Sequence, residues 1–270
     1  MQLKDKILWR LAQPQLKRNA AFKGRHQGES CYIFGNGASL KSMDLDRFSD
    51  RVSISCNSCF FHMDFGKLNC LYYHLPAAFL FYRYRKYYGA WYRNYIGDLF
   101  RRKIGENPKT RFFTSLSNCL NMRGENVYYT HHFGSRTWDF QKTALDGEFS
   151  FMQGGLYAML GMAAYFGFTN AILVGCDYAF TPRYGSHFFE KGLGQPVYED
   201  ESPYGGDIFE RCQERMDLTL LVPDGVQSNL MKTVSYSEYT GRPMEYKENL
   251  DIIDGHDLAY LAKQGYYNIY

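Results

Sequence analysis

The sequence predicts an α/β protein built on a Rossmann-like, doubly wound and mainly parallel sheet. Short apolar runs of β-favouring residues alternate with helical segments, and unusual polar residues follow the ends of several runs. Alternation of this kind is typical of parallel sheets with helices on both faces. Ligands of such sheets bind outside the carboxyl ends of the strands, so the polar residues found there are the first candidates for a site.

The first half of the chain contains five candidate strands. The run 31–34 is stopped by Gly35, and residues 35–39 are expected to turn tightly into a helix. The other four runs are 52–56, 69–73, 111–113 and 127–129. Between the third and fourth runs, residues 76–103 form a basic and aromatic segment that we predict to be helical.

The second half contains the most apolar elements. Small and apolar residues over 154–166 predict a helix that ends at Gly167, and the strand 171–175 is followed by Asp177. Residues 178–206 have no periodicity and predict a long loop or lid. A helix over 207–216 and a final strand over 218–222 complete the pattern.

Length and composition favour one domain. A chain of 270 residues with 45% hydrophobic content is long enough for one sizeable core. We expect a single Rossmann-like domain over 29–270, preceded by a basic extension over 1–28. A short helix broken near Pro14 is expected in that extension, which is either solvated or in contact with a membrane surface.

Charge is distributed unevenly along the chain. The net charge of +3 excludes a protein that binds polyanions over its whole surface. Residues 1–30 hold seven basic residues against two acidic ones, and residues 83–103 hold seven against one. The aromatic and basic segment 76–103 fits single-stranded nucleic acid, an anionic membrane or a phosphorylated glycan acceptor, or the charged outer face of a lid helix.

Seven cysteines are present, and only Cys56 and Cys59 have the two-residue gap of a metal or redox motif. No second pair follows at a suitable distance, so we expect buried, reduced thiols and no metal site. No signal peptide is visible and no apolar run approaches 18 residues. These features predict a cytoplasmic protein.

Two asparagines lie at successive strand ends. Gly35-Asn36-Gly37 follows the first run directly, and Asn57 follows the second. Glycines let a backbone approach a phosphate or ribose closely, and an amide offers both a donor and an acceptor. Ser39 is expected to cap the following helix or to reach a phosphate. The pattern is neither GxGxxG nor a Walker loop, and each asparagine could instead be an ordinary turn residue.

Four blocks of sequence together resemble the family 42 bacterial sialyltransferases and the related DUF115-type glycosylation proteins. They cover roughly residues 31–230 in the same order as in that family. The blocks are Ile33–Asp44 (IFGNGASLKSMD), Ser55–Phe61 (SCNSCFF), Gly154–Met159 (GGLYAM) with Ile172–Tyr178 (ILVGCDY), and Asp207–Ile208 with Leu221–Asp224 (LVPD).

The resemblance implies a Rossmann-like domain with a lid and catalysis without a metal. It implies that Asn36 and Asn57 contact the nucleotide of a CMP-sugar, and that Tyr178 and Tyr184 bind the donor phosphate. Phenol hydroxyls suit that role because they stabilise a departing phosphate without a cation. The family uses a lid histidine as general base, and His187 is the candidate here. The remaining residues expected at the nucleotide are Gly35, Gly37, Ser39, His74, Gly154, Gly155 and Asp177.

Several positions depart from the family pattern. The family histidine lies closer to the helix near Asp207, where this chain has Ser202-Pro203-Tyr204. His74 stands where the family has asparagine, and Phe151 and Gly154 stand where it has arginine and serine. These contacts help to define a sialyl donor, so the donor sugar is either sialic acid or a Kdo-like sugar. Asp177 has no partner in an Asp-x-Asp pair, so it is a structural or ribose-contacting carboxylate.

We therefore expect a metal-independent glycosyltransferase that moves a sugar from a CMP-sugar donor to a glycan or glycolipid acceptor in polysaccharide or lipopolysaccharide synthesis. No cofactor and no nucleic-acid partner are expected. A peripheral position on the inner face of the cytoplasmic membrane and a homo-oligomer fit this role. The alternatives are a DUF115-like pterin pyrophosphokinase using ATP and Mg²⁺, which the missing carboxylate pair argues against, and a non-catalytic nucleotide-sugar-binding protein.

Overall fold

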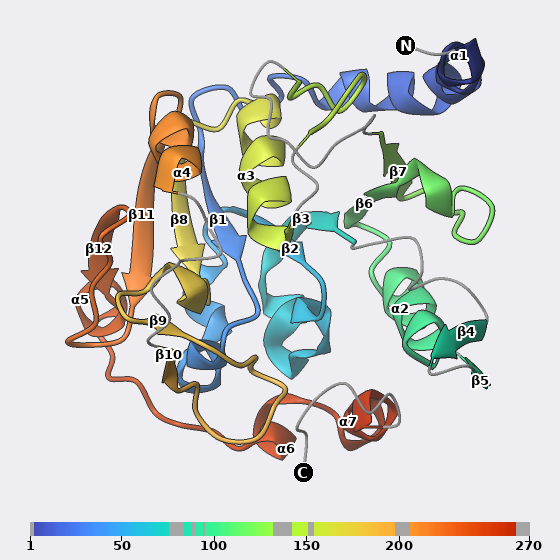
Figure 1. Cartoon of the computed structure of the whole chain (residues 1–270). Coiled ribbons are helices and arrows are strands. Elements are labelled where there is room, and N and C mark those ends of the chain that lie inside the picture. The colour runs from blue at the N-terminus through green and yellow to red at the C-terminus, as the bar shows by residue number, and fades with distance from the viewer. Residues whose placement is uncertain are drawn as a thin grey trace.

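The computed structural model describes residues 3–75, 84–87, 90–93, 95–131, 142–150, 154–197 and 206–262. Its centre is an eight-stranded sheet in the order β12-β11-β8-β1-β2-β3-β6-β7 (Figure 1). All seven pairs of neighbours are parallel, which confirms the predicted fold class. The strands are β1 (Ser30–Phe34), β2 (Val52–Cys56), β3 (Asn69–His74), β6 (Arg111–Ser115), β7 (Val127–Thr130), β8 (Asn170–Val174), β11 (Asp217–Val222) and β12 (Lys232–Ser235).

The order of the strands places a topological switch point between β1 and β8. From β1 the chain moves outward through β2, β3, β6 and β7, and it then returns to the other side of β1 with β8, β11 and β12. The turns after β1 and β8 therefore leave the sheet in opposite directions. A crevice at such a point is where ligands bind in doubly wound sheets.

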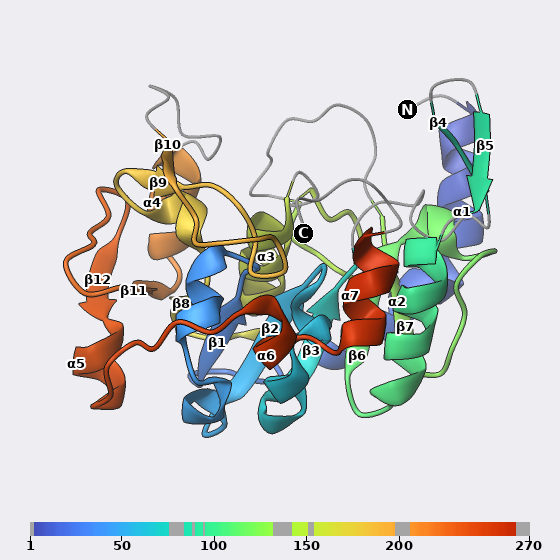
Figure 2. The same cartoon turned by 90° about the horizontal axis from the view of Figure 1, so that it is seen from below.

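Both faces of the sheet are covered, which explains why its central strands are apolar on both sides. Figure 2, seen from below, separates the two layers. One hydrophobic cluster joins the sheet to α3 (Gly155–Phe166) and α4 (Gly206–Gln213). The other joins it to the 3₁₀ segments η2 (Ala38–Ser42), η3 (Leu45–Phe48), η4 (Cys59–Phe61) and η5 (Met63–Lys67) and to α2 (Tyr95–Glu106), α5 (Tyr236–Thr240), α6 (Asn249–Ile252) and α7 (Gly255–Ala262).

Three expected elements differ from the structure. The segment 76–103 is expected to be helical, but only its last part lies in α2. Before α2, β4 (Tyr84–Tyr87) and β5 (Ala90–Arg93) pair as an antiparallel hairpin, and residues 76–83 lie outside the described residues. The aromatic residues of the hairpin favour strands, which outweighs the helical pattern. The strand at 218–222 is not the last, because the short and polar β12 adds an edge to the sheet. The glycine turn leads into the five-residue η2 rather than a longer helix.

The expected lid over 178–206 contains short ordered pieces. A 3₁₀ turn, η8 (Asp177–Ala179), leads into β9 (Arg183–Tyr184), which pairs with β10 (Pro196–Val197). Residues 198–205 of the expected lid lie outside the described residues.

The basic N-terminal segment is packed against the domain. Helix α1 (Leu3–Lys17) runs through Pro14 and continues into η1 (Arg18–Phe22), so the break expected at Pro14 is absent. Buried Ala12 and Leu16 on either side of Pro14 hold this part of the helix against the domain. Asn19 donates to the backbone oxygens of Tyr129 and Leu145, each at 2.7 Å.

The seven cysteines are all free of disulfides, and six of them are buried. Within the described part of the chain, no helix has both the length and the apolar character needed to cross a membrane.

We predict that Phe22→Ala lowers the free energy of unfolding by about 3–5 kcal/mol. The Phe22 ring is 3% exposed and meets the rings of Tyr72, Phe113, Tyr128 and Phe166, so its loss leaves a cavity in the core. Denaturant unfolding measures the change, with Leu11→Ala as the control. Leu11 is 71% exposed, and its variant should stay within about 0.5 kcal/mol of the native chain. Equal stability of both variants would show that 18–28 is a solvated extension.

Candidate functional site

A cavity of about 120 Å³ lies at the carboxyl edge of the sheet, beside the switch point. It brings together turns after β1, β2 and β8, the first residues of α3 and the turn that carries His187. Seven of the residues predicted from the sequence line it: Gly35, Asn36, Gly37, Asn57, Gly155, Tyr178 and His187. Four others were not predicted, Cys56, Leu156, Gly175 and Cys176, although all lie within two residues of a predicted residue.

The glycines of the loop are required by the neighbouring turn of the protein itself. The two turns continue the hydrogen bonding of β1 and β8, with Gly35 donating to Val174 and Gly37 to Gly175, both at 2.8 Å. A Cβ atom on Gly35 would lie 2.2 Å from the Gly175 oxygen. A Cβ atom on Gly37 would lie 2.2 Å from the Asp177 carboxyl group. The loop therefore forms a wall of the cavity, and its glycines serve close packing of protein against protein.

The side chain of Asn36 is used internally. Its Nδ2 donates to the Cys56 oxygen at 3.1 Å, and its Oδ1 accepts from the Ser58 amide at 3.1 Å. This bridge ties the turn after β1 to the turn after β2. Asn36 therefore shapes the cavity wall, and its amide has little capacity left for a ligand.

Asn57 differs from Asn36 in having an uncommitted amide oxygen. Its backbone is left-handed, with φ 54°, and is fixed by a bond from its amide to the His74 oxygen and by the Tyr73 hydroxyl on its carbonyl. The Oδ1 atom is buried and has no hydrogen-bond partner among the described residues. A buried unpaired acceptor is costly, so a ligand donor at this position would stabilise the site.

The N-terminus of α3 borders the same space. Gly154 precedes the helix without a side-chain cap, and Gly155 and Leu156 line the cavity. A Cβ atom on Gly155 would lie 2.6 Å from the Cys56 sulfur, so glycine allows the helix end to approach β2. A helix N-terminus favours anions such as phosphate because of its amides and its dipole.

Tyr178 and His187 lie next to each other in the lining of the cavity. Their ring centroids are 6.5 Å apart in an edge-on arrangement, and the His187 side chain is 33% exposed. His187 is fixed to the glycine loop through a bridge to Gly37, and the Phe188 amide donates to the Asn36 oxygen at 3.0 Å. The lid turn and the glycine loop are thus one connected wall.

Ser39 and Asp177 form a buried pair behind that wall. The Ser39 amide and hydroxyl donate to the two carboxylate oxygens of Asp177 at 2.8 and 2.5 Å. The bonds of Ser39 thus go to Asp177, and neither residue is among those that line the cavity. These bonds are consistent with the structural role expected for Asp177. Burial raises the pKa of Asp177 to about 6, against the bonds from Ser39, which favour the carboxylate.

Three other predicted residues lie outside the cavity lining. The Tyr184 ring packs against the Phe180 ring, with their centroids 5.6 Å apart. His74 ends β3 opposite Cys56, and burial lowers the pKa of its imidazole to about 4. Gly154 lies one residue before the first lining residue of α3. Phe151, expected where the family has arginine, falls outside the described residues.

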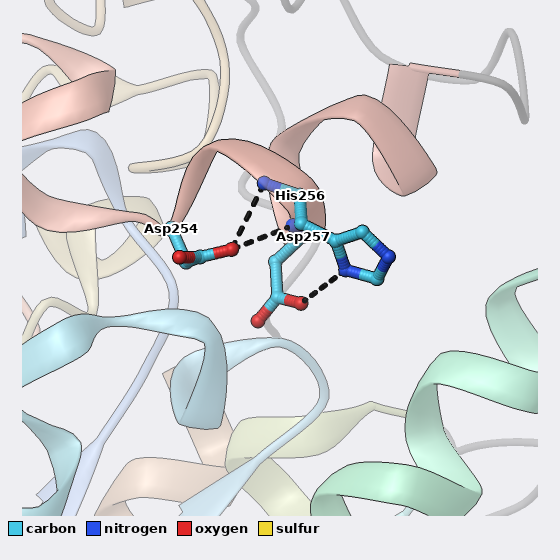
Figure 3. A group of neighbouring side chains, drawn as sticks. All are labelled: Asp254, His256 and Asp257. Carbon is cyan, nitrogen blue, oxygen red and sulfur yellow. Dashed lines mark hydrogen bonds and ion pairs between the residues drawn. The ribbon is translucent and has the colours of Figure 1, made fainter.

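One group of side chains in the described part of the chain has metal-ligand spacing, namely Asp254, His256 and Asp257 (Figure 3). Asp254 Oδ1 instead accepts from the first amides of α7, at 2.9 Å from His256 and 3.4 Å from Asp257. Asp257 is 1% exposed and forms ion pairs with Arg102 and Lys103 of α2. The group therefore caps α7 and fastens it to α2.

Comparison with solved structures finds sialyltransferases. Sialyltransferase CST-II in complex with a trisaccharide acceptor and CMP has a TM-score of 0.46 and 16% identity, over 87% of this chain and 99% of that one. CstII from Campylobacter jejuni with CMP-3FNeuAc has a TM-score of 0.46 and 17% identity, with the same coverage. The apo α-2,3-sialyltransferase from Campylobacter jejuni has a TM-score of 0.42 and 14% identity, over 88% of this chain and 94% of that one. No family model and no curated protein matches the chain.

We predict that Asp177 makes stability depend on pH between about 4 and 6. The pKa of Asp177 is about 6 in the folded protein and 3.8 in the unfolded chain, so folding favours the protonated carboxyl group. Its contribution to the free energy of unfolding is fully present below pH 3.8 and is lost as the pH rises through 6. Relative to Asp177→Asn, the native chain should lose about 3 kcal/mol of unfolding free energy over this range. Denaturant unfolding of both chains at several pH values measures the difference, and a difference that does not change with pH would contradict the assignment.

Proposed function

We propose that this chain is a metal-independent glycosyltransferase that transfers sialic acid or a Kdo-like sugar from a CMP-sugar to a hydroxyl of a cell-surface glycan. The observation that carries the proposal is the cavity at the switch point. It gathers an uncommitted amide at Asn57, the N-terminus of α3, the Tyr178 phenol and the His187 imidazole from four separate parts of the chain.

The nucleotide half of the donor fits the side of the cavity formed by Gly35–Gly37, Asn57 and α3. Asn57 Oδ1 suits a donor group of a base or ribose, because it is an unpaired acceptor. The amides at the start of α3 suit the phosphate. No carboxylate is among the lining residues that the structure describes, so the lining offers a divalent cation only neutral oxygens such as Asn57 Oδ1.

The reacting half fits beside Tyr178 and His187, whose rings both line the cavity. The acceptor hydroxyl oxygen would bond to the anomeric carbon while the bond from that carbon to the phosphate oxygen breaks and CMP leaves. The hydroxyl proton would pass to His187, and the Tyr178 hydroxyl would donate a hydrogen bond to the departing phosphate. Tyr184 packs on Phe180 and is not among the residues that line the cavity, so Tyr178 is the better candidate for the contact with the phosphate.

The acceptor would be presented at an anionic membrane surface inside the cell. Helix α1 supports this part of the proposal, because Leu11 is 71% exposed there next to exposed Arg10, and exposed Lys17 ends the helix. Apolar and basic side chains together favour a surface with anionic lipids.

We predict that CMP raises the melting temperature of the protein in the absence of divalent metal. A ligand at 100 times its dissociation constant adds about 2.7 kcal/mol, which corresponds to a shift of about 5 °C or more. A thermal-shift panel of CMP, UDP, GDP and ATP, with and without Mg²⁺, measures this. Asn57→Ala should weaken CMP binding by about tenfold through the loss of one hydrogen bond. A response only to UDP or GDP would exclude the CMP donor, and a response only to ATP with Mg²⁺ would favour a kinase.

We predict that His187→Ala lowers kcat by about 100-fold or more, because a general base contributes that much to proton transfer. The CMP dissociation constant should stay within about twofold, since the nucleotide contacts are assigned to Asn57 and the start of α3 and not to the imidazole. Turnover of a CMP-sugar and titration of CMP measure the two quantities. Unchanged turnover would remove His187 from the mechanism.

A further inference from the structure

The turn that carries His187, residues 186–190, is organised around the carboxylate of Glu190. Oε2 of Glu190 accepts from the Ser186 hydroxyl at 2.7 Å and from the His187 amide at 2.8 Å. The same oxygen lies 3.5 Å from Nδ1 of His187. Ser186 has a left-handed backbone, with φ 81°, which is uncommon for a residue with a side chain, so these bonds hold a strained conformation.

A buried lysine fixes Glu190 from the other side. The Lys41 side chain belongs to η2, directly after the glycine loop, and Lys41 is 0% exposed. Its Nζ donates to the backbone oxygens of Glu190 at 2.5 Å and of Gly192 at 2.8 Å. Asn249 adds a bond to the Phe189 oxygen at 3.1 Å. The backbone of Glu190 is therefore anchored to the same loop that forms the nucleotide wall.

The imidazole of His187 has two distinct edges in this arrangement. Its buried Nδ1 lies within ion-pair distance of Glu190 Oε2 but does not form a hydrogen bond with it in this conformation, and its ring stacks on Phe189 with centroids 5.0 Å apart and planes 10° apart. The same ring lines the cavity. The other nitrogen, Nε2, lies at the opposite edge of the ring from Nδ1.

We propose that Glu190 is the positioning residue of His187, holding the proton of the neutral imidazole on Nδ1 and so making Nε2 the nitrogen that accepts the proton of the acceptor hydroxyl. The inference rests on the proposed function. When the acceptor hydroxyl gives its proton to Nε2, the ring becomes an imidazolium and the ionised carboxylate of Glu190 stabilises the new charge.

Glu190 remains ionised over the whole neutral range. Burial opposes its ionisation, but hydrogen bonds from His187 and Ser186 outweigh burial and lower the pKa of Glu190 to about 2. A carboxylate that served only to brace the turn would use the same bonds from Ser186 and the His187 amide. The two roles therefore differ in what the loss of the negative charge does to the imidazole.

The test compares Glu190→Gln with Ser186→Ala. The first variant keeps an oxygen acceptor for the turn and removes the charge, whereas the second removes one hydrogen bond and keeps the charge. The tautomer of His187 is read from the ¹⁵N chemical shifts of its imidazole at a pH where the ring is neutral. The variant His187→Gln assigns the signal. We expect the Nδ1–H tautomer in the native chain and in Ser186→Ala, and a shift toward Nε2–H in Glu190→Gln.

Activity provides the second readout. With a CMP-sugar and a glycan acceptor, Glu190→Gln should lower kcat by about 10–100-fold with KM for the donor within about twofold, whereas Ser186→Ala should change kcat by less than about threefold. If Glu190→Gln does not fold, Glu190→Asp provides a second variant, which keeps the negative charge on a shorter side chain. Its kcat should be lower than that of the native chain, but activity should not be lost.

The two proposals fail in different ways. The tautomer measurement needs no donor sugar, so a tautomer shift in a chain without transferase activity would support the positioning role and overturn the proposed function. An unchanged tautomer in Glu190→Gln would overturn the positioning role whatever the activity. Equal kcat in Glu190→Gln and Ser186→Ala would also overturn it.

Discussion

The contact between the turns after β1 and β8 is the constraint on which the site depends. Phe34 and Val174 are register partners, and hydrogen bonding continues past both strands into the turns. Gly37 leaves room for the Asp177 carboxyl group, which accepts both donors of Ser39. Because these turns leave the sheet in opposite directions, locking them together at their base creates a hollow with fixed walls.

The other parts of the site are attached to this contact between the two turns through the loop that follows β1. Asn36 ties the first turn to the turn after β2, which places Asn57 in its left-handed conformation at the rim. Gly37 pairs with His187, and Lys41 anchors the backbone of Glu190. The loop from Gly35 to Lys41 thus organises the wall assigned to the nucleotide and the turn assigned to proton transfer. A change in this loop should affect both halves of the cavity.

The parts of the structure that follow from local pattern could be predicted from the sequence. Central strands such as 31–34 and 171–175 are apolar because both faces of the sheet are covered, so they stand out as apolar runs. Asn57 could be found because it follows a strand, and His187 because it is the only histidine between residues 133 and 255. Edge strand β12 could not, because its polar sequence KTVS lacks an apolar run.

The interactions that join distant segments were beyond sequence reasoning. The glycine loop suggested a phosphate site, whereas its glycines are explained by Asp177 and Gly175, nearly 140 residues away. Ser39 was interpreted as a helix cap because its partner, the buried carboxylate of Asp177, is also distant in the sequence. Glu190 lies close to His187 in sequence, but its role depends on the conformation of the turn and on Lys41.

The most direct test of the central claim is a titration of the ¹⁵N-labelled protein with CMP in the absence of divalent metal, followed by amide NMR. The account predicts the largest shifts at Gly35, Gly37, Asn57 and Gly155, which enclose the cavity from three separate segments. Shifts confined to another surface, such as α7, or no shifts at saturating CMP would contradict it.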